Sequence, residues 1–592
     1  DGNAALRVIH PQVREATIPQ RWRPEHLKEY LREGFALAPA ATGDSFLRRR
    51  YRQPLTAIMV VVALVLLIAC ANITNLLLAR ATARRHELSV RVALGASRYR
   101  IARQLLAESL LLSVTGALIG LLFALWGSRL LVRQLSTSAN LVFLDLGIDW
   151  RMLGFTAAVA IATAVVFGVA PALRGTRVQP GDALKEQGRS IAGDRRFALG
   201  NLLVISQVAL SLVLIVAAGL FLRTFSALAR LDVGFDRDPV LVASVDVQRL
   251  QSEPTERAAL FERLRAAAAA VPGVSSAAAS PVTPVSGSTW QFALEYVNGT
   301  QVPEGRERRS VYVNLISPGW FRTYGTTLIA GRDFNDADTA AAPKVAIVNE
   351  AFARKFLNGQ NPLGARLREM GFPGRPAVER QVVGYVEDAI YRSLREPVPP
   401  TMYLPIPQQP DPPPFIAISV RAAGGNPVLL TKSVAAALTG VHPDVAITFR
   451  PLAEQVNSAL VQERIVAILS GFFGALALLL AGLGLYGVTS YAVNRRRTEI
   501  GIRMALGAAP DGVVRMVLGR VALLVGLGIA VGAGISIWAS KFVETLLYGL
   551  KPRDAGTLIA ATLVLATIGA IAGWLPARRA ARIDPARVLR DG

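Results

Sequence analysis

Cysteine and histidine are scarce in this sequence of 592 residues, which contains one Cys and four His. The single cysteine excludes an intrachain disulfide framework, and because Cys70 lies in an apolar run we expect a small residue packed against lipid or core. The histidines are scattered and lack the spacing of metal ligands. These absences argue against a disulfide-stabilised scaffold and against a metal centre built on histidine.

Nucleotide-binding and catalytic motifs are absent as well. The chain has no Gly-Lys pair and therefore lacks the phosphate-binding loop of P-loop NTPases. No nucleophile, base and orienting group combine within residues 227–461, so we expect neither an enzyme nor a bound cofactor or metal. Asp333, Asp336 and Asp338 follow a Gly-Arg turn and could form a cation site, although a solvated turn is the favoured interpretation.

Apolar residues and positive charge are abundant. Apolar residues make up 52% of the chain, and 65 Lys and Arg against 42 Asp and Glu give a net charge of +23. Residues 1–226 carry 27 basic and 13 acidic side chains, residues 227–461 carry 23 and 22, and residues 462–592 carry 15 and 7. Apolar, basic ends around a neutral middle indicate a membrane protein with one large soluble domain, and they give no reason to expect a nucleic-acid partner.

Seven apolar segments are long enough to cross a bilayer as helices, since about 20 residues span its hydrocarbon core. They lie at residues 54–79, 105–132, 152–173, 198–222, 465–493, 513–540 and 556–575. The basic connections are 80–103, 174–197, 494–515 and 577–592. By the positive-inside bias these connections face the cytoplasm, which leaves residues 1–52 and 227–461 outside. Four arginines between positions 48 and 52 weaken this orientation, because they precede the first span on the outer side.

The membrane segments repeat. Residues 84–97, RRHELSVRVALGAS, match residues 496–509, RRTEIGIRMALGAA, at eight of fourteen positions. PALRGTRVQPGDAL at 171–184 likewise matches PARRAARIDPARVL at 576–589. The repeated unit is a span, a basic loop, a span, an external turn, a span and a basic tail. Parallel repeats of this kind occur in many transporter folds.

In both copies the first basic loop has the pattern of a short charged helix. The residues that we assign to these loops are Glu87, Arg91, Leu94, Gly95, Glu499, Arg503, Leu506 and Gly507. In each copy Glu and Arg stand four residues apart in the favourable order for a helical ion pair, and the glycine is placed to end the helix. We expect Ile500, Met504 and Arg503 to form one partly apolar, partly basic surface. Such a helix docks a cytoplasmic partner, which its recurrence favours, or lies against lipid headgroups.

Residues 227–461 alternate strand-like and helical patterns, which predicts an α/β domain of about 235 residues in two lobes. The strand-like segments begin at residues 240, 345, 380 and 401, and helices are expected at 255–271 and after residue 350.

Several polar residues and glycines lie within the predicted spans: Asn72, Asn75, Ser206, Gln207, Ser211, Gly116, Gly120, Gly526, Gly528, Gly532 and Gly534. The polar residues either line a pathway or form hydrogen bonds between helices, and we favour the second interpretation. The glycines fit close helix packing.

These features together resemble the MacB/FtsX-like permeases of ABC-type systems, and most of all the duplicated orphan permeases of acidobacteria. The segments that carry the resemblance include LIACANITNLLLARATARRHELSVRVALGASRYRIARQLLAESLLL at 67–112, ISPGWFRTYGTTLIAGRDF at 316–334, VAIVNEAFARKFLNGQNPLG at 345–364 and VVGYVEDAIYRSLREP at 382–397. The resemblance covers nearly the whole chain.

The resemblance implies an α-helical polytopic membrane protein with two FtsX-like units and one large α/β extracytoplasmic domain of MacB periplasmic-core type. The implied domains are the end of a truncated first external domain (1–52), a first permease unit (53–197), a stalk helix (198–226), the periplasmic core domain (227–461) and a second permease unit (462–592). The chain would then be an N-terminally incomplete member of its family.

The resemblance also implies a permease of the bacterial inner membrane that works with a separate ABC ATPase. ATP would be bound by that subunit, and its contacts would fall on the loops around Glu87–Gly95 and Glu499–Gly507. Motion would pass through the bilayer to the periplasmic domain and drive efflux of a substrate. The alternative is an FtsX-like scaffold that signals to a periplasmic partner, such as a cell-wall hydrolase, without transport.

Overall fold

The computed structural model describes residues 2–18, 27, 30–32, 34–35, 46–83, 98–135, 150–151, 153–161, 194–250, 253–303, 305–371, 376–506, 509–544, 547–549 and 554–582. The chain divides into two compact units. We call the first, Asp1–Phe46 with Arg230–Leu460, the sheet unit, and the second, Leu47–Ala229 with Val461–Gly592, the membrane unit. Most of the sheet unit is therefore inserted into the sequence of the membrane unit.

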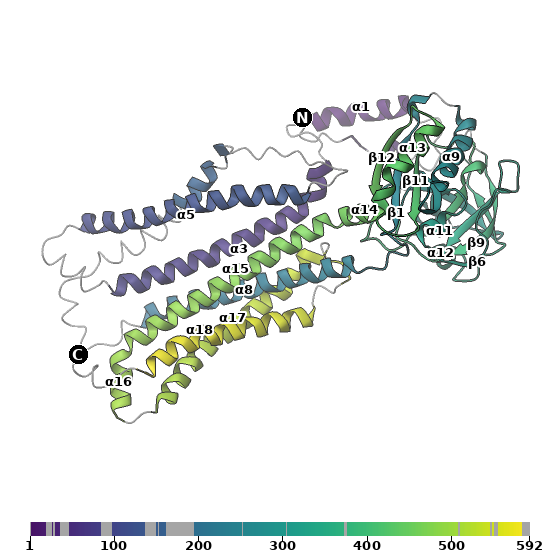
Figure 1. Ribbon diagram of the computed structural model, residues 1–592. Helices are drawn as coiled ribbons and strands as arrows, with labels where there is room; N and C mark the ends of the chain where they lie inside the picture. Colours follow the sequence, from purple (N-terminus) through teal and green to yellow (C-terminus); the bar gives the residue numbers. More distant parts are fainter. Residues whose placement is uncertain are drawn as a thin grey trace. The chain divides into compact units, whose positions relative to one another are not determined.

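The membrane unit is helical (Figure 1). Its helices are α3 (Phe46–Ala83), α5 (Arg98–Leu135), α8 (Asp194–Ala229), α15 (Val461–Arg495), α16 (Arg497–Ala505), α17 (Pro510–Val543) and α18 (Ala555–Ala580). All except the short α16 contain a stretch that is long and apolar enough to cross a membrane, which confirms six of the seven predicted spans. The predicted span 152–173 lies largely outside the described residues, of which 153–161 are helical.

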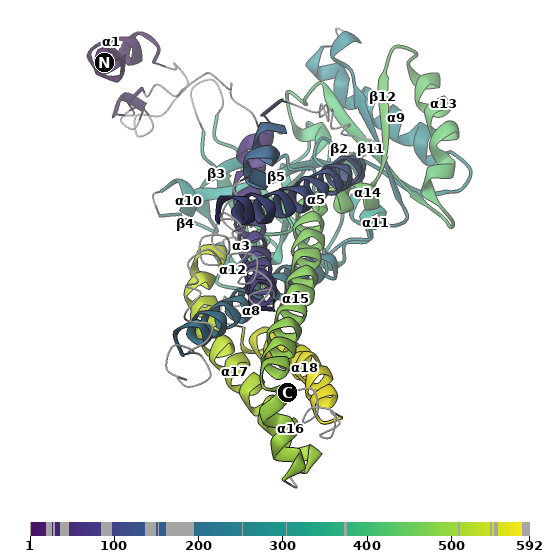
Figure 2. The same ribbon diagram turned by 90° about the vertical axis from the view of Figure 1, so that its left-hand side faces the viewer.

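Helix α8 lies at the centre of a bundle. It packs against α15, α17 and α18, and α18 also packs against α15 and α17 (Figure 2). These helices share an apolar cluster that includes Val208, Leu212, Leu485 and Leu565, each almost fully buried. Apolar side chains that point away from the bundle, such as Leu527 and Leu563, are exposed, as expected for a surface that faces lipid.

Two of the predicted packing glycines bring α17 close to α8. A β-carbon added at Gly528 would lie 2.6 Å from Val208 Cβ, and one added at Gly532 would lie 2.8 Å from the carbonyl oxygen of Ala209. The prediction is confirmed for these two positions. An added β-carbon at Gly116, Gly120, Gly526 or Gly534 would meet no atom within 4 Å among the residues that the structure describes.

The sheet unit contains two β-sheets. The first has four antiparallel strands in the order β12 (Ala446–Pro451), β1 (Val240–Asp246), β11 (Phe415–Ala422) and β2 (Val274–Ser280). Helices α9 (Pro254–Ala269) and α13 (Thr431–Val441) pack against each other, and α9 also contacts β2 and β11. Helix α9 begins at a proline, whose fixed φ and missing N–H suit the first helical position.

The second sheet has eight strands. They are β3 (Trp290–Val297), β4 (Thr300–Gln301), β5 (Ser310–Ile316), β6 (Leu328–Gly331), β7 (Val345–Asn349), β8 (Arg366–Glu369), β9 (Glu379–Val386) and β10 (Thr401–Pro405). The pairs β5–β10 and β7–β9 are parallel and the others are antiparallel. Because β8 pairs with both β3 and β9, the strands β3, β5, β10, β7, β9 and β8 form a closed ring.

Short helices connect these strands. They are α10 (Arg306–Arg309), α11 (Trp320–Tyr324), α12 (Glu350–Phe356), α14 (Leu452–Ala459) and the 3₁₀ turns η2 (Gln248–Leu250), η3 (Ile406–Gln408) and η4 (Pro427–Leu430), and α1 (Gly2–Ala16) lies near the start of the chain. Asn349 shows how β7 passes into α12, because its side chain accepts a hydrogen bond of 3.0 Å from the amide of Phe352. One apolar core joins both sheets. The predicted strands and helices of this region are confirmed.

Candidate functional site

The helix α16, which connects α15 to α17, is held against the membrane unit by a small apolar cluster. Ile500 of α16 is 1% exposed and packs with Val493, Val513 and Ala580, which come from α15, α17 and α18. Met504, one turn later, packs against the same cluster. Three membrane helices therefore fix the position of α16.

The outward face of α16 carries charge and apolar surface together. Glu499 and Arg503 form the predicted ion pair at 2.6 Å, and both side chains are about half exposed. Ile502 is 44% exposed and Leu506, at the end of the helix, is 83% exposed. We call Glu499, Ile502, Arg503 and Leu506 the α16 ridge.

The composition of this surface corrects the prediction. Ile500 and Met504 were expected beside Arg503, but they face the membrane helices, because packing against α15, α17 and α18 buries one side of α16. Ile502 and Leu506 take their place on the outward face. Glu87, Arg91, Leu94 and Gly95 of the first copy lie outside the described residues, as does Gly507.

Arg223 and the start of α18 form a second charged contact of the membrane unit. Arg223 of α8 pairs with the carboxylate of Asp554 and donates a hydrogen bond of 3.0 Å to Thr557 Oγ1. Asp554 also accepts a hydrogen bond of 2.8 Å from the amide of Thr557, so it caps α18. Hydrogen bonds from Thr557, aided by the charge of Arg223, lower the pKa of the Asp554 carboxyl. This contact ties α8 to α18 at the end where α8 leaves for the sheet unit.

Three polar side chains of the spans donate hydrogen bonds to backbone carbonyls of α15. Asn72 Nδ2 of α3 and Gln207 Nε2 of α8 both reach the carbonyl oxygen of Leu480, at 2.9 Å and 2.7 Å. Ser211 Oγ reaches that of Ala477 at 3.3 Å. These contacts confirm the interpretation of helix–helix hydrogen bonding.

The other two polar residues of the spans differ. Ser206 donates a hydrogen bond of 2.8 Å to Leu202 of its own helix. The side chain of Asn75 lies outside the described residues. The sequence analysis did not identify the part that α15 plays in these hydrogen bonds, because α15 contributes only a backbone carbonyl group and a glycine, Gly484. A β-carbon added at Gly484 would lie 2.6 Å from the side-chain amides of both Asn72 and Gln207.

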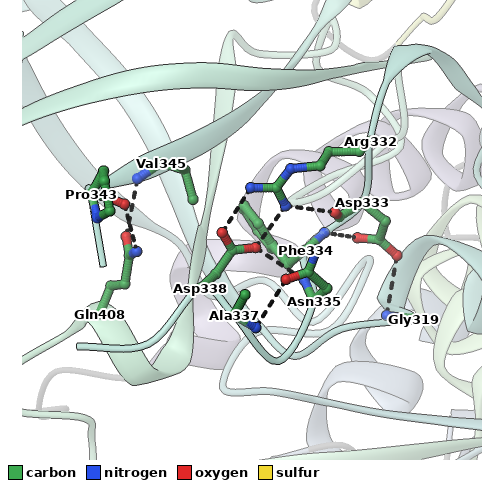
Figure 3. Close-up of polar contacts among 10 residues, drawn as sticks. All are labelled: Gly319, Arg332, Asp333, Phe334, Asn335, Ala337, Asp338, Pro343, Val345 and Gln408. Atoms are coloured by element: carbon green, nitrogen blue, oxygen red, sulfur yellow. Dashed lines mark hydrogen bonds and ion pairs between the residues drawn. The ribbon is translucent and has the colours of Figure 1, made fainter. Parts of the chain in front are cut away.

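The acidic cluster of the sheet unit is an internal ion-pair network (Figure 3). Arg332 makes two hydrogen bonds of 2.8 Å to the Asp338 carboxylate, whose residue is 5% exposed. The two oxygens of Asp333 accept hydrogen bonds from the amides of Phe334 and Gly319, at 2.7 Å and 3.1 Å. The predicted solvated turn is therefore right only for the exposed Asp336.

The pKa values of the two carboxyls in this network shift in opposite directions. Hydrogen bonds from Arg332 lower the pKa of Asp338, whereas burial raises the pKa of Asp333. In the part of the chain that the structure describes, no three His, Cys, Asp or Glu residues are grouped to hold a metal ion. Nearby, Gln408 binds the backbone of Val345 and Pro343, at 3.1 Å and 3.0 Å (Figure 3). The network has a structural role in fixing the segment between β6 and β7.

Both units of the chain match known protein families. The family described as FtsX-like permease C-terminal matches the chain twice, at residues 59–180 and 471–585. The family described as MacB-like periplasmic core domain matches residues 201–468. Each FtsX-like match contains one copy of the repeat at 84–97 and 496–509, and the MacB-like match contains the two sheets.

Similar proteins are ABC transporter permeases. An uncharacterized ABC transporter permease of Bacillus subtilis, YknZ, is 25% identical over 291 residues, which cover 48% of this chain and 71% of that protein. The pyoverdine export ATP-binding/permease protein PvdT of Pseudomonas savastanoi is 27% identical over 319 residues, 50% of this chain and 45% of PvdT. The macrolide export ATP-binding/permease protein MacB of Chromobacterium violaceum is 30% identical over 180 residues, 30% of this chain and 28% of MacB. The chain thus spans less than half of the length of PvdT and MacB.

Proposed function

Because the chain is an FtsX-like permease that carries a MacB-like periplasmic core domain, we propose that it is the membrane subunit of an ABC-type efflux system whose ATPase is a separate protein. The relatives PvdT and MacB are named as fused ATP-binding/permease proteins. The 592 residues contain no P-loop motif, and we propose that a separate partner supplies ATP hydrolysis. The substrate class is left open.

The α16 ridge is the observation that carries this proposal. It presents an ion pair and two exposed apolar side chains, Ile502 and Leu506, on a helix that is fixed to three membrane helices. A partner that binds the ridge and moves would displace α15, α17 and α18 together, because Ile500 is buried among them. The loop at 84–97 repeats the same sequence pattern, so two such docking sites are proposed in one chain.

The proposed orientation places α16 in the cytoplasm and the sheet unit in the periplasm. The basic connections support it through the positive-inside bias. Helices α8 and α15 then form the stalk, since the chain enters the sheet unit after α8 and leaves it before α15. Their contact along the bundle, with Ser211 bonded to Ala477, suits them to transmit motion of α16 to the sheet unit.

The test is co-purification from native membranes with mass spectrometry of the bound proteins. We expect the natural chain to co-purify with an ABC ATPase in stoichiometric amount. The triple variant Arg91→Glu, Arg503→Glu, Leu506→Asp should recover at least tenfold less ATPase, because each change removes or opposes a contact at the ridge or its repeat. Arg263→Glu, the same charge reversal at an exposed position of α9, is the control and should retain the ATPase. A periplasmic hydrolase without any ATPase would favour the scaffold alternative, and ATPase binding unaffected by the triple variant would reject the ridge.

A further inference from the structure

A buried turn lies where the chain passes from the first sheet to the second. Residues 281–289 connect β2, which belongs to the first sheet, to β3, which belongs to the second. Within this connection the Ser286 amide donates a hydrogen bond of 3.2 Å to the carbonyl oxygen of Thr283, which closes a β-turn. The two central residues of the turn, Pro284 and Val285, are buried. A change in the turn would therefore act at a junction between the sheets.

Val285 has an unfavourable backbone conformation in this turn, with a φ of 58°. The ring of Pro284 holds its own φ near about −65°, so a positive φ at the next residue makes a type II turn. That position is normally glycine or asparagine, because a β-branched side chain is strained at positive φ. Among the described residues, the other non-glycine residues with positive φ are both asparagines, Asn298 and Asn358. Val285 is thus a strained residue that its surroundings must hold in place.

Two hydrogen bonds hold the peptide group between Pro284 and Val285. Its carbonyl oxygen accepts a hydrogen bond of 2.7 Å from Gln455 Nε2, which also reaches Thr283 Oγ1 at 2.9 Å. Its amide donates a hydrogen bond of 2.8 Å to the carbonyl oxygen of Tyr391. A flip of this peptide group would convert the turn to type I and give Val285 an ordinary negative φ. The flip would also break both hydrogen bonds, so these bonds oppose the relief of strain.

The two partners of the peptide group belong to different sheets. Gln455 lies on α14, which packs against β1 and β12 of the first sheet. Tyr391 lies between β9 and β10 of the second sheet, and its ring contacts that of Tyr403 on β10, with centroids 6.2 Å apart. The strained peptide group therefore bridges the two sheets. Leu460 alone separates α14 from α15, which is one of the two proposed stalk helices.

We propose that the Pro284–Val285 peptide is a two-state joint between the sheets, and that Gln455 is the positioning residue that holds it. With Gln455 in place, the peptide keeps its strained type II orientation and links the sheets. When α14 shifts away from the turn, the peptide flips to type I, its bond to Tyr391 is lost, and the sheets can separate at this point. The inference rests on the proposed function only for the source of this motion, which would reach α14 from α15.

The test is amide hydrogen exchange of the full chain in detergent, with mass spectrometry of peptides that cover residues 282–290. In the natural chain the amides of Val285 and Ser286 should both be protected. Gln455→Ala should speed exchange of the Val285 amide by about tenfold, a factor within the range of backbone strain of this kind. The Ser286 amide should stay protected, because its hydrogen bond closes both turn types. Asn457→Ala, at an exposed position of α14, is the control and should leave exchange unchanged.

A substitution of Val285 distinguishes a flip of the peptide from a general loosening of the turn. Glycine adopts a positive φ without strain, so a turn with Val285→Gly should stay in the type II form even without Gln455. The double variant Val285→Gly, Gln455→Ala should therefore protect the amide of residue 285 again. Unchanged exchange in Gln455→Ala would overturn the proposal, and so would fast exchange that persists in the double variant.

The source of the motion is tested in the complex that co-purification recovers. Saturating ATP should speed exchange of the Val285 amide by about tenfold relative to the nucleotide-free complex, and should have no such effect in Val285→Gly. Unchanged exchange in the natural complex would reject Gln455 as the link to the stalk, while the partnership with the ATPase would stand. Absence of any ATPase would instead reject the proposed function, and exchange in the isolated chain would still decide whether the turn has two states.

Discussion

The sheet unit and the membrane unit treat their buried polar groups differently. In the sheet unit, charged side chains pair with each other: Glu369 with Arg380, which are 5% and 2% exposed, and Asp338 with Arg332. In the membrane unit, the neutral amides of Asn72 and Gln207 donate to a carbonyl of a neighbouring helix. Lipid supplies no hydrogen-bond partner and penalises charge, so neutral donors and backbone acceptors suffice there.

The two units also differ in how their cores are filled. Large side chains fill the sheet unit, where Trp320, Tyr324 and Tyr403 are fully buried. In the membrane unit, close contact depends on the absence of side chains, since Gly528 and Gly532 let α17 approach α8. The sheet unit should therefore be most sensitive to the removal of side-chain atoms, and the membrane unit to their addition.

The largest effect is expected from Trp320→Ala in the sheet unit. Trp320 is 0% exposed, packs against Tyr324 with ring centroids 4.5 Å apart, and donates a hydrogen bond of 3.1 Å to Ser280. Its truncation should lower the free energy of unfolding of this unit by about 3–5 kcal/mol. Thermal unfolding of the purified chain measures the effect. Trp538→Ala, at a site 62% exposed in the membrane unit, is the control, and an equal shift in both would contradict the contrast.

A smaller effect, of opposite origin, is expected from Gly532→Ala in the membrane unit. The added methyl would lie 2.8 Å from the carbonyl oxygen of Ala209 and 3.0 Å from its Cα, so α17 must move away from α8. Overpacking of this kind destabilises by about 1–3 kcal/mol. Gly534→Ala, where an added β-carbon meets no described atom within 4 Å, should leave the stability in detergent unchanged or raise it slightly. Equal stability of the Gly532→Ala and Gly534→Ala variants would show that the glycine contact does not contribute to stability.

The smallest effect, present at neutral pH and lost in acid, is expected from Asp338→Asn. Because Arg332 lowers the pKa of Asp338 in the folded chain, the ionised carboxylate stabilises the fold at neutral pH. That contribution is present above the pKa of the unfolded chain and is lost as the pH falls through the folded pKa. The natural chain should exceed the variant in stability at pH 7, and the difference should shrink in acid. Asp333, whose pKa is raised, is common to both proteins and largely cancels.

Denaturant unfolding at several pH values measures this difference, with Asp336→Asn as the control at an exposed carboxylate. A gap between the natural chain and Asp338→Asn that stays constant from pH 7 into the acid range would show that the ion pair with Arg332 contributes no pH-dependent stability.

The sequence predicted the elements better than their mutual orientation. Six spans follow from length and hydropathy, and strands such as β1 follow from their apolar runs, because both signals are local. The face of α16 that is buried was not predictable in the same way. Ile500 and Ile502 are chemically alike, and only the positions of Val493, Val513 and Ala580, on three other helices, decide which of them is covered. The acceptor at Leu480 is a backbone atom and has no sequence signature.

Strand β1, the first of the sheet unit, pairs along its length with β12, the last. The segment that arrives from α8 and the segment that returns through α14 to α15 are thus hydrogen-bonded neighbours. Because its first and last strands are paired, an inserted domain of this kind can be exchanged, enlarged or shortened over evolutionary time without any change in the order of the membrane helices. The sheet unit can therefore vary between related chains while α8 and α15, the two helices on either side of the insertion, stay the same.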